Sequence, residues 1–218
     1  MTFLKHNHVS LRQLSHKMLA FLVSVLLVFV LAAPFAPATT ALAENTSSHK
    51  SSVTDEPKLT EATTAIVTDA QGNVLWSKNP DQELPMASIT KVMTAIVALD
   101  SGVNLDEPCK ITVPDLEEGS QVAGLTSDDT PTLRQLIMMM LVYSANDAAY
   151  NIAVNVSGSQ QAFVDQMNKK AAEIGMTHTQ FQNPHGLDAD GHYSTARDLA
   201  LMGRYAREHY PLIASAVH

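Results

Sequence analysis

Apolar residues recur at helical spacing along a stretch that begins near Pro85. Val92, Ala95, Ile96 and Leu99 occupy positions i, i+3, i+4 and i+7, so they line one face of a predicted helix. Proline is favoured in the first turn of a helix, which agrees with a start at this point. The pattern therefore predicts a helix with a buried apolar face.

The same spacing predicts four further helical segments toward the C-terminus. Thr132 is a suitable cap for the first of them, whose centre is apolar all round, as is typical of a helix buried on most sides. The others end near Gly158, Gly175 and Pro211, which are residue types that end helices. The four segments are residues 133–141, 147–157, 163–174 and 195–210.

Two short β-type runs, residues 64–68 and 74–77, precede the helices. Gly72 lies between them and can adopt the positive φ that a hairpin turn needs. A third strand is expected at residues 109–113, inside a loop-rich region over residues 101–131. Strands followed by helices predict the α/β (α+β) class, with an incomplete antiparallel sheet.

The N-terminus has the pattern of an export signal. Lys5, Arg12 and Lys17 flank the start of an apolar run, and Ala-Leu-Ala at residues 41–43 is a small-x-small cleavage site. Residues 1–43 are predicted to be a signal peptide that directs the chain to the cell envelope. The alternative is an uncleaved segment that holds the chain at the membrane surface. The Ser-, Thr-, Lys- and Glu-rich residues 44–60 predict a flexible linker.

The charge of the remaining chain argues against nucleic acid as a partner. Residues 1–43 hold three of the 14 Lys and Arg residues and none of the 22 Asp and Glu residues, which leaves a formal net charge of −11. Cys109 is the one cysteine in the sequence, so the chain has no internal disulfide. We interpret Cys109 as a small buried apolar residue.

Ser88 and Lys91 form the first candidate for catalysis. They lie three residues apart, so both project from one side of the first helical turn. A serine hydroxyl becomes a nucleophile when a neighbour removes its proton, and a lysine can do so when burial keeps its amine neutral. The alternative is a helix cap with a solvated lysine, and a second S-x-x-K pattern, Ser47 to Lys50, lies in the linker.

Ser144-Ala145-Asn146 forms the second candidate, at the junction of two predicted helices. In an acyl-transfer site, Ser144 can relay a proton between Lys91 and a leaving amine. Asn146 can hold a substrate amide while it contacts the lysine.

Three segments together resemble the low-molecular-mass penicillin-binding proteins, the serine D-alanyl-D-alanine carboxypeptidases. They are residues 85–91, residues 143–149 and residues 181–199, which read Phe-Gln-Asn-Pro-His-Gly-Leu-Asp and then Gly-His-Tyr-Ser-Thr-Ala-Arg-Asp-Leu. The resemblance implies a β-lactamase or DD-peptidase-like fold with a helical subdomain. It also implies an exported, cofactor-free hydrolase that removes the terminal D-alanine from peptidoglycan stem peptides and is acylated by β-lactams.

The resemblance assigns a role to each candidate residue. Ser88 matches the acylated nucleophile, and its backbone N–H matches half of the oxyanion hole. Lys91 matches the general base, and Ser144 and Asn146 match the second motif, with Asn146 binding substrate. Ala145 resembles the carboxypeptidases rather than the class A β-lactamases, which have Asp at this position.

The family's third motif, K-T-G, has no match after Lys91. None of Lys110, Lys169 and Lys170 is followed by Thr-Gly or Ser-Gly. In the family this strand binds the substrate carboxylate and completes the oxyanion hole. Residues 61–218 are therefore expected to be a partial catalytic domain of a C-terminally truncated enzyme. The alternative is an inactive fragment, or a remnant that binds peptidoglycan.

The loop over residues 181–195 contains residue types that ligate metals: His185, Asp188, Asp190 and His192. The interpretation we favour is a turn-rich loop at the rim of the site, stabilised by Asx turns, and no metal site is predicted.

Overall fold

The computed structural model describes residues 59–217. The predicted signal peptide, residues 1–43, and almost all of the predicted linker lie outside the described residues. Both therefore stay predictions.

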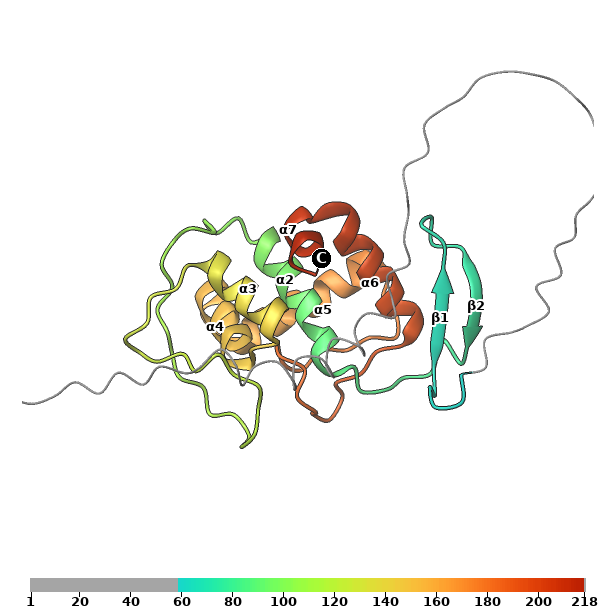
Figure 1. The fold of residues 1–218 in the computed structure, drawn as a ribbon, viewed down its shortest axis with the longest axis horizontal. Coiled ribbons are helices and arrows are strands. Elements are labelled where there is room, and N and C mark those ends of the chain that lie inside the picture. Colours follow the sequence, from blue (N-terminus) through green and yellow to red (C-terminus); the bar gives the residue numbers. More distant parts are fainter. Residues whose placement is uncertain (1–58, 218) are drawn as a thin grey trace, which may run out of the picture. The chain divides into compact units, whose positions relative to one another are not determined.

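A hairpin and a body of helices make up the described part of the chain (Figure 1). The elements in chain order are β1 (Ala65–Thr68), β2 (Val74–Lys78), the 3-10 turn η2 (Ala87–Ile89), α2 (Thr90–Asp100), α3 (Leu133–Tyr143), α4 (Asn146–Ser157), α5 (Gln160–Ile174), α6 (Ala196–His209) and α7 (Pro211–Ala216).

Helix α2 lies at the centre of the helical body, where it contacts α3, α4, α5 and α6 (Figure 1). Ala95, Ile96 and Ala98 have no exposed surface, and most of the helix is buried rather than one face alone. The predicted start near Pro85 is wrong. Residues 87–89 form the 3-10 turn η2, in which Ala87 has a left-handed φ of 48°, and the α-helix begins only at Thr90.

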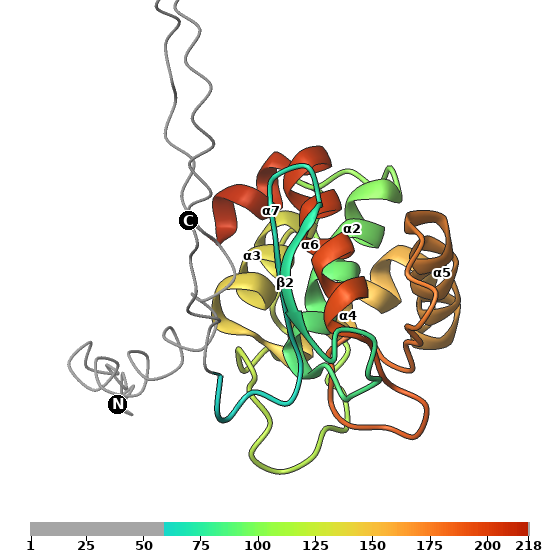
Figure 2. The ribbon, with the colours of Figure 1, turned by 90° about the vertical axis from the view of Figure 1, so that its right-hand side faces the viewer.

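Strands β1 and β2 form the predicted antiparallel hairpin. Ile66 lies opposite Ser77 and Val67 opposite Trp76, and the register shifts between Val67 and Thr68. Gly72 has the expected positive φ, at 91°. The hairpin contacts α6 through β1 and lies in front of that helix in Figure 2. Helices with a small antiparallel sheet confirm the predicted class.

The strand expected at residues 109–113 is absent. Instead, this segment is held by amide side chains on α4: Asn151 bonds the backbone of Thr112, and Asn155 that of Lys110, through both the N–H and the C=O. The segment therefore has the alternating burial of a strand, but apart from the bond of the Cys109 N–H to the carbonyl of Pro131, its backbone partners are two asparagines one helical turn apart. Hydrophobic alternation alone could not distinguish the two arrangements.

The helix ends agree with most of the sequence signals. Thr132 closes a capping box with Gln135 at the start of α3, and Gly158 and Gly175 cap α4 and α5 with positive φ. Pro211 does not simply end the last helix. It is the first residue of α7, a position where its missing N–H costs nothing.

The centre of α3 is buried on most sides, as predicted: Leu136, Ile137 and Met140 have no exposed surface. The two residues after the predicted segment, Val142 and Tyr143, are 66% and 48% exposed.

Cys109 is buried, at 5% exposure, as expected for a small apolar residue. Burial, with a smaller effect from Glu107, raises the pKa of its thiol. The thiol therefore stays protonated at neutral pH.

Among residues 59–217, no helix combines the length and the apolar character needed to cross a bilayer.

Candidate active site

Ser88, Lys91 and Ser144 meet at the N-terminal end of α2. Ser88 lies in η2 and Lys91 in the first turn of α2, while Ser144 lies at the junction of α3 and α4. Lys91 Nζ donates to Ser88 Oγ at 3.0 Å, and Ser144 Oγ donates to Ser88 Oγ at 2.9 Å. The Ser88 hydroxyl is thus held between an amine and a second hydroxyl.

The backbone on both sides of this cluster adopts left-handed conformations. Ser144 has a φ of 60° as the C-cap of α3, and Ala87, directly before Ser88, has a φ of 48°. Non-glycine residues rarely adopt such angles, and each costs on the order of 1–3 kcal/mol, so they persist where the surrounding structure imposes them. Here they sharply redirect the chain next to each of the two bonded hydroxyls.

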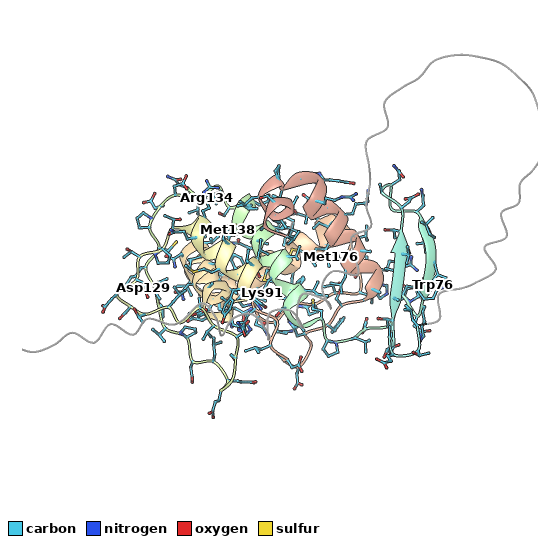
Figure 3. All side chains as sticks on the ribbon, viewed as in Figure 1. Trp76, Lys91, Asp129, Arg134, Met138 and Met176 are labelled. Carbon is cyan, nitrogen blue, oxygen red and sulfur yellow. The ribbon has the colours of Figure 1, made fainter. Side chains whose placement is uncertain are left out.

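Lys91 lies inside the helical body, at the lower end of α2 in Figure 3. It is 3% exposed, and its second partner is the backbone carbonyl of His185, at 2.5 Å. No acidic side chain of the described residues pairs with it. Burial therefore lowers the pKa of the Lys91 amine from 10.5 to about 8. A neutral amine can donate to the His185 carbonyl and still accept the Ser88 proton.

The loop over residues 181–195 packs against the first two turns of α2 through hydroxyl groups. Thr94 Oγ1 donates to the carbonyl of Pro184 at 2.6 Å, and Thr90 Oγ1 lies 2.9 Å from His192 Nε2. The backbone N–H of Gln182 donates to His192 Nδ1, so the ring proton is on Nε2 and points to Thr90. Thr90 precedes Lys91 in α2 and Thr94 follows it, so the loop is held to the helix both before and after the lysine.

Gly186 allows this loop to approach η2 closely. A Cβ at this position would lie 2.0 Å from the carbonyl oxygen of Ala87 and 3.0 Å from Thr90 Oγ1, and Gly186 itself has a φ of 92°. Only glycine combines that backbone angle with that contact distance. Its place directly after His185 therefore helps to bring the carbonyl of His185 to Lys91.

Asn146 is buried at the start of α4, at 4% exposure. Its backbone N–H donates to the carbonyl of Gln121 at 2.8 Å. The side-chain amide makes no hydrogen bond to Lys91 or to any other residue that the structure describes. The residue is thus largely buried, while its amide is free of hydrogen bonds to the described residues.

Sequence reasoning did not identify Asp147, the residue after Asn146. Its carboxylate accepts the backbone N–H groups of Ala123, Gly124 and Leu125 at 2.8–3.0 Å. This anchors the loop that carries Gln121 next to the site. A single aspartate in a helix gives no sequence signal for such a role, because its partners lie in a loop without periodicity.

The rings of the loop histidines hydrogen-bond neighbouring residues. Both ring nitrogens of His192 are used, toward Thr90 and Gln182, and His185 Nδ1 accepts from the backbone N–H of Leu187. Within residues 59–217, no three His, Cys, Asp or Glu side chains are grouped so that they could hold a metal ion.

Comparison with known proteins identifies the family of this chain. The family described as D-alanyl-D-alanine carboxypeptidase, Peptidase_S11, matches residues 50–216. The D-alanyl-D-alanine carboxypeptidase DacF of Bacillus subtilis is 33% identical over 187 residues, which are 84% of this chain and 46% of the relative. A D-alanyl-D-alanine endopeptidase of Pseudomonas aeruginosa is 41% identical over 155 residues, 69% of this chain and 48% of the relative.

Solved structures of penicillin-binding proteins share the fold of this chain. The crystal structure of penicillin binding protein 6B from Escherichia coli has a TM-score of 0.69 and 29% identity, over 76% of this chain and 56% of that one. The chain spans about half the length of the curated relatives it matches. Because the family match extends over residues 50–216, well beyond half of the sequence, the chain belongs to the Peptidase_S11 family of D-alanyl-D-alanine carboxypeptidases.

Proposed function

We propose that this chain performs the acyl-transfer chemistry of a serine D-alanyl-D-alanine carboxypeptidase on peptidoglycan stem peptides. The observation that carries the proposal is the Ser88 hydroxyl between the Lys91 amine and the Ser144 hydroxyl. The buried Lys91, without an acidic partner among the described residues, has the lowered pKa that a general base needs. Several relatives are themselves named carboxypeptidases.

In the acylation step, the neutral Lys91 amine accepts the proton of Ser88 while Ser88 Oγ attacks the carbonyl carbon between the two D-alanines. The backbone N–H of Ser88 donates to the oxyanion that develops. The carbon–nitrogen bond then breaks, and the proton passes from Lys91 through Ser144 to the leaving amine. D-Alanine departs, and the remaining peptide is an ester of Ser88.

In the deacylation step, water attacks this ester, and its proton returns to Ser88 as the carboxylate product leaves. A β-lactam would be attacked in the same way, but its amine remains tethered to the acyl group, so it cannot depart. We assign the amide of Asn146 to the substrate, since Asn146 lies two residues after Ser144 and its amide has no hydrogen-bond partner among the described residues.

The cellular setting is part of the same proposal. Residues 1–43 would export the chain to the cell envelope, where peptidoglycan lies, and residues 44–60 would link the N-terminal segment to the catalytic residues. If the signal is not cleaved, it would hold the enzyme at the membrane surface.

Labelling with a fluorescent penicillin tests the proposal. We expect a covalent label that peptide mapping places on Ser88, and Ser88→Ala should abolish it. Ser47→Ala is the matched control, because Ser47 and Lys50 repeat the same spacing outside the site. A folded protein that takes no label, or a label that survives Ser88→Ala, would contradict the proposal.

A further inference from the structure

The loop over residues 181–195 supplies the carbonyl that contacts the general base, so the position of the loop decides what that amine meets. Two of its three hydrogen bonds to α2 in the described part of the chain use backbone carbonyls, those of Pro184 and His185. The third uses a side chain, the ring of His192, which lies 2.9 Å from Thr90 Oγ1. A substitution at His192 can therefore release the loop without changing its backbone.

Both nitrogens of the His192 ring are used, and they connect three segments of the chain. Nδ1 accepts the backbone N–H of Gln182 at 3.0 Å, which joins the two ends of the loop, and Nε2–H donates to Thr90 Oγ1. The ring is 4% exposed and packs edge-on against Phe181. These contacts fix the orientation of the ring, and with it the place of the loop relative to the first residue of α2.

Thr90 brings this contact next to the catalytic pair. It directly precedes Lys91 and has no exposed surface. A Cβ on Gly186 would lie 3.0 Å from Thr90 Oγ1, so the hydroxyl also packs against the turn directly after His185. Within residues 59–217, the bond to His192 is the one hydrogen bond of the Thr90 side chain. Loss of that bond would free both the hydroxyl and the turn that packs on it.

We propose that His192 is a positioning residue for the general base. Its ring joins the loop to the start of α2, and this keeps the His185 carbonyl on the Lys91 amine and keeps water away from that amine. The proposal rests on the proposed function, because the role matters only if Lys91 deprotonates Ser88. His192 itself bonds neither of these two side chains.

The ring is neutral over the pH range in which Lys91 changes its charge. Nδ1 can accept a backbone N–H only without a proton, and burial lowers the pKa of His192, against a smaller opposite effect of Asp188. His185 in the same loop is neutral as well, because burial and the nearby Lys91 lower its pKa to about 4. Asp198, in the first turn of α6, bonds the segment before the loop. A pH profile above pH 7 therefore reports the amine rather than the ring.

The midpoint of the pH–rate profile for penicillin labelling tests the role, since it reports the pKa of the Lys91 amine. Thr90→Val and His192→Asn each remove the bond between these two side chains, while the asparagine can still accept the N–H of Gln182. We expect each variant to raise the midpoint from about 8 by about one pH unit, because water reaches the amine, and to lower the rate at pH 7 about tenfold. Thr90→Ser retains the hydroxyl and should restore the midpoint of the unaltered protein.

The double variant shows whether one bond is responsible. Thr90→Val with His192→Asn should raise the midpoint no further than either change alone, because both remove the same contact. Thr177 and His178 are the matched control, since they are an exposed threonine and histidine 3.1 Å apart outside the loop. Thr177→Val with His178→Asn should leave the midpoint unchanged.

Unchanged midpoints in the folded single variants, or shifts that add in the double variant, would overturn the inference. If His192→Asn does not fold, the comparison of Thr90→Val with Thr90→Ser decides alone. A label on Ser88 of the unaltered protein, together with unchanged midpoints in the variants, refutes only the positioning role. No label on the unaltered protein refutes the proposed function and, with it, the inference that depends on it.

Discussion

Lys91 gives the most specific prediction, because its amine must be neutral to accept the proton of Ser88. Burial lowers its pKa from 10.5 to about 8. With this pKa, about 10% of the amine is neutral at pH 7 and about 90% at pH 9, whereas an unperturbed lysine would be only about 0.03% neutral at pH 7. The rate of Ser88 acylation should therefore rise roughly ninefold from pH 7 to pH 9 and then level off.

The assay is the rate of fluorescent penicillin labelling between pH 6 and pH 10. Lys170→Met is the matched control, because Lys170 bonds Asp100 and Glu173, which raise the pKa of its amine and keep it charged. This variant should keep the same pH profile. A rate that still climbs tenfold per pH unit above pH 9 would show that Lys91 has an ordinary pKa, and the reasoning from burial would be wrong.

The same shift predicts how folding stability depends on pH. The folded-state pKa of Lys91 lies below the unfolded value of 10.5, so between pH 8 and pH 10.5 the unfolded chain binds more protons at this residue. Its contribution to the free energy of unfolding is unfavourable below pH 8 and is relieved as the pH rises, by roughly 3 kcal/mol in total. Urea denaturation of the protein and of Lys91→Met should diverge in this direction over that range. Parallel pH dependences would refute it.

Three substitutions test other parts of the structure. Gly186→Ala should abolish penicillin labelling and lower the free energy of unfolding by about 2 kcal/mol or more, because its Cβ would clash with backbone beside the nucleophile. Gly158→Ala, at similar φ but with open space around it, should keep the label, and loss of the label there would remove the argument from close packing. Thr132→Ala should cost about 1 kcal/mol in urea denaturation through the lost capping box, with labelling unchanged; no change in stability would disprove the cap. Asn151→Leu should expose the backbone of Thr112 to hydrogen exchange, since both of its bonds to that side chain are lost, and continued protection would contradict the clamp.

The elements that depend on local pattern were the ones that sequence reasoning predicted well. The hairpin, the start of α3 after Thr132 and the ends of α4 and α5 at glycines all follow from short-range rules of backbone geometry. The errors arose where distant residues intervened. A strand was expected at residues 109–113, but two asparagines on α4 bond that backbone instead.

In the candidate site too, the contact between residues close in sequence was predicted, and the contacts between distant residues were not. The spacing of Ser88 and Lys91 predicted that they face each other, since residues three apart share one side of a helical turn. The sequence placed Ser144 in the same site through the resemblance of its motif, without fixing its bond to Ser88. Nothing in the sequence showed that the carbonyl of His185 would bond Lys91, or that Gly186 would touch the turn before the nucleophile.

The sequence by itself thus determined which segments form helices, which residues can serve as base and nucleophile, and which family the motifs resemble. The tertiary structure decided whether that pair is chemically competent. The lowered pKa of Lys91 results from its burial in α2, a helix that packs against four others and against a distant loop, and desolvation is a property of the surrounding packing rather than of neighbouring residues in the chain.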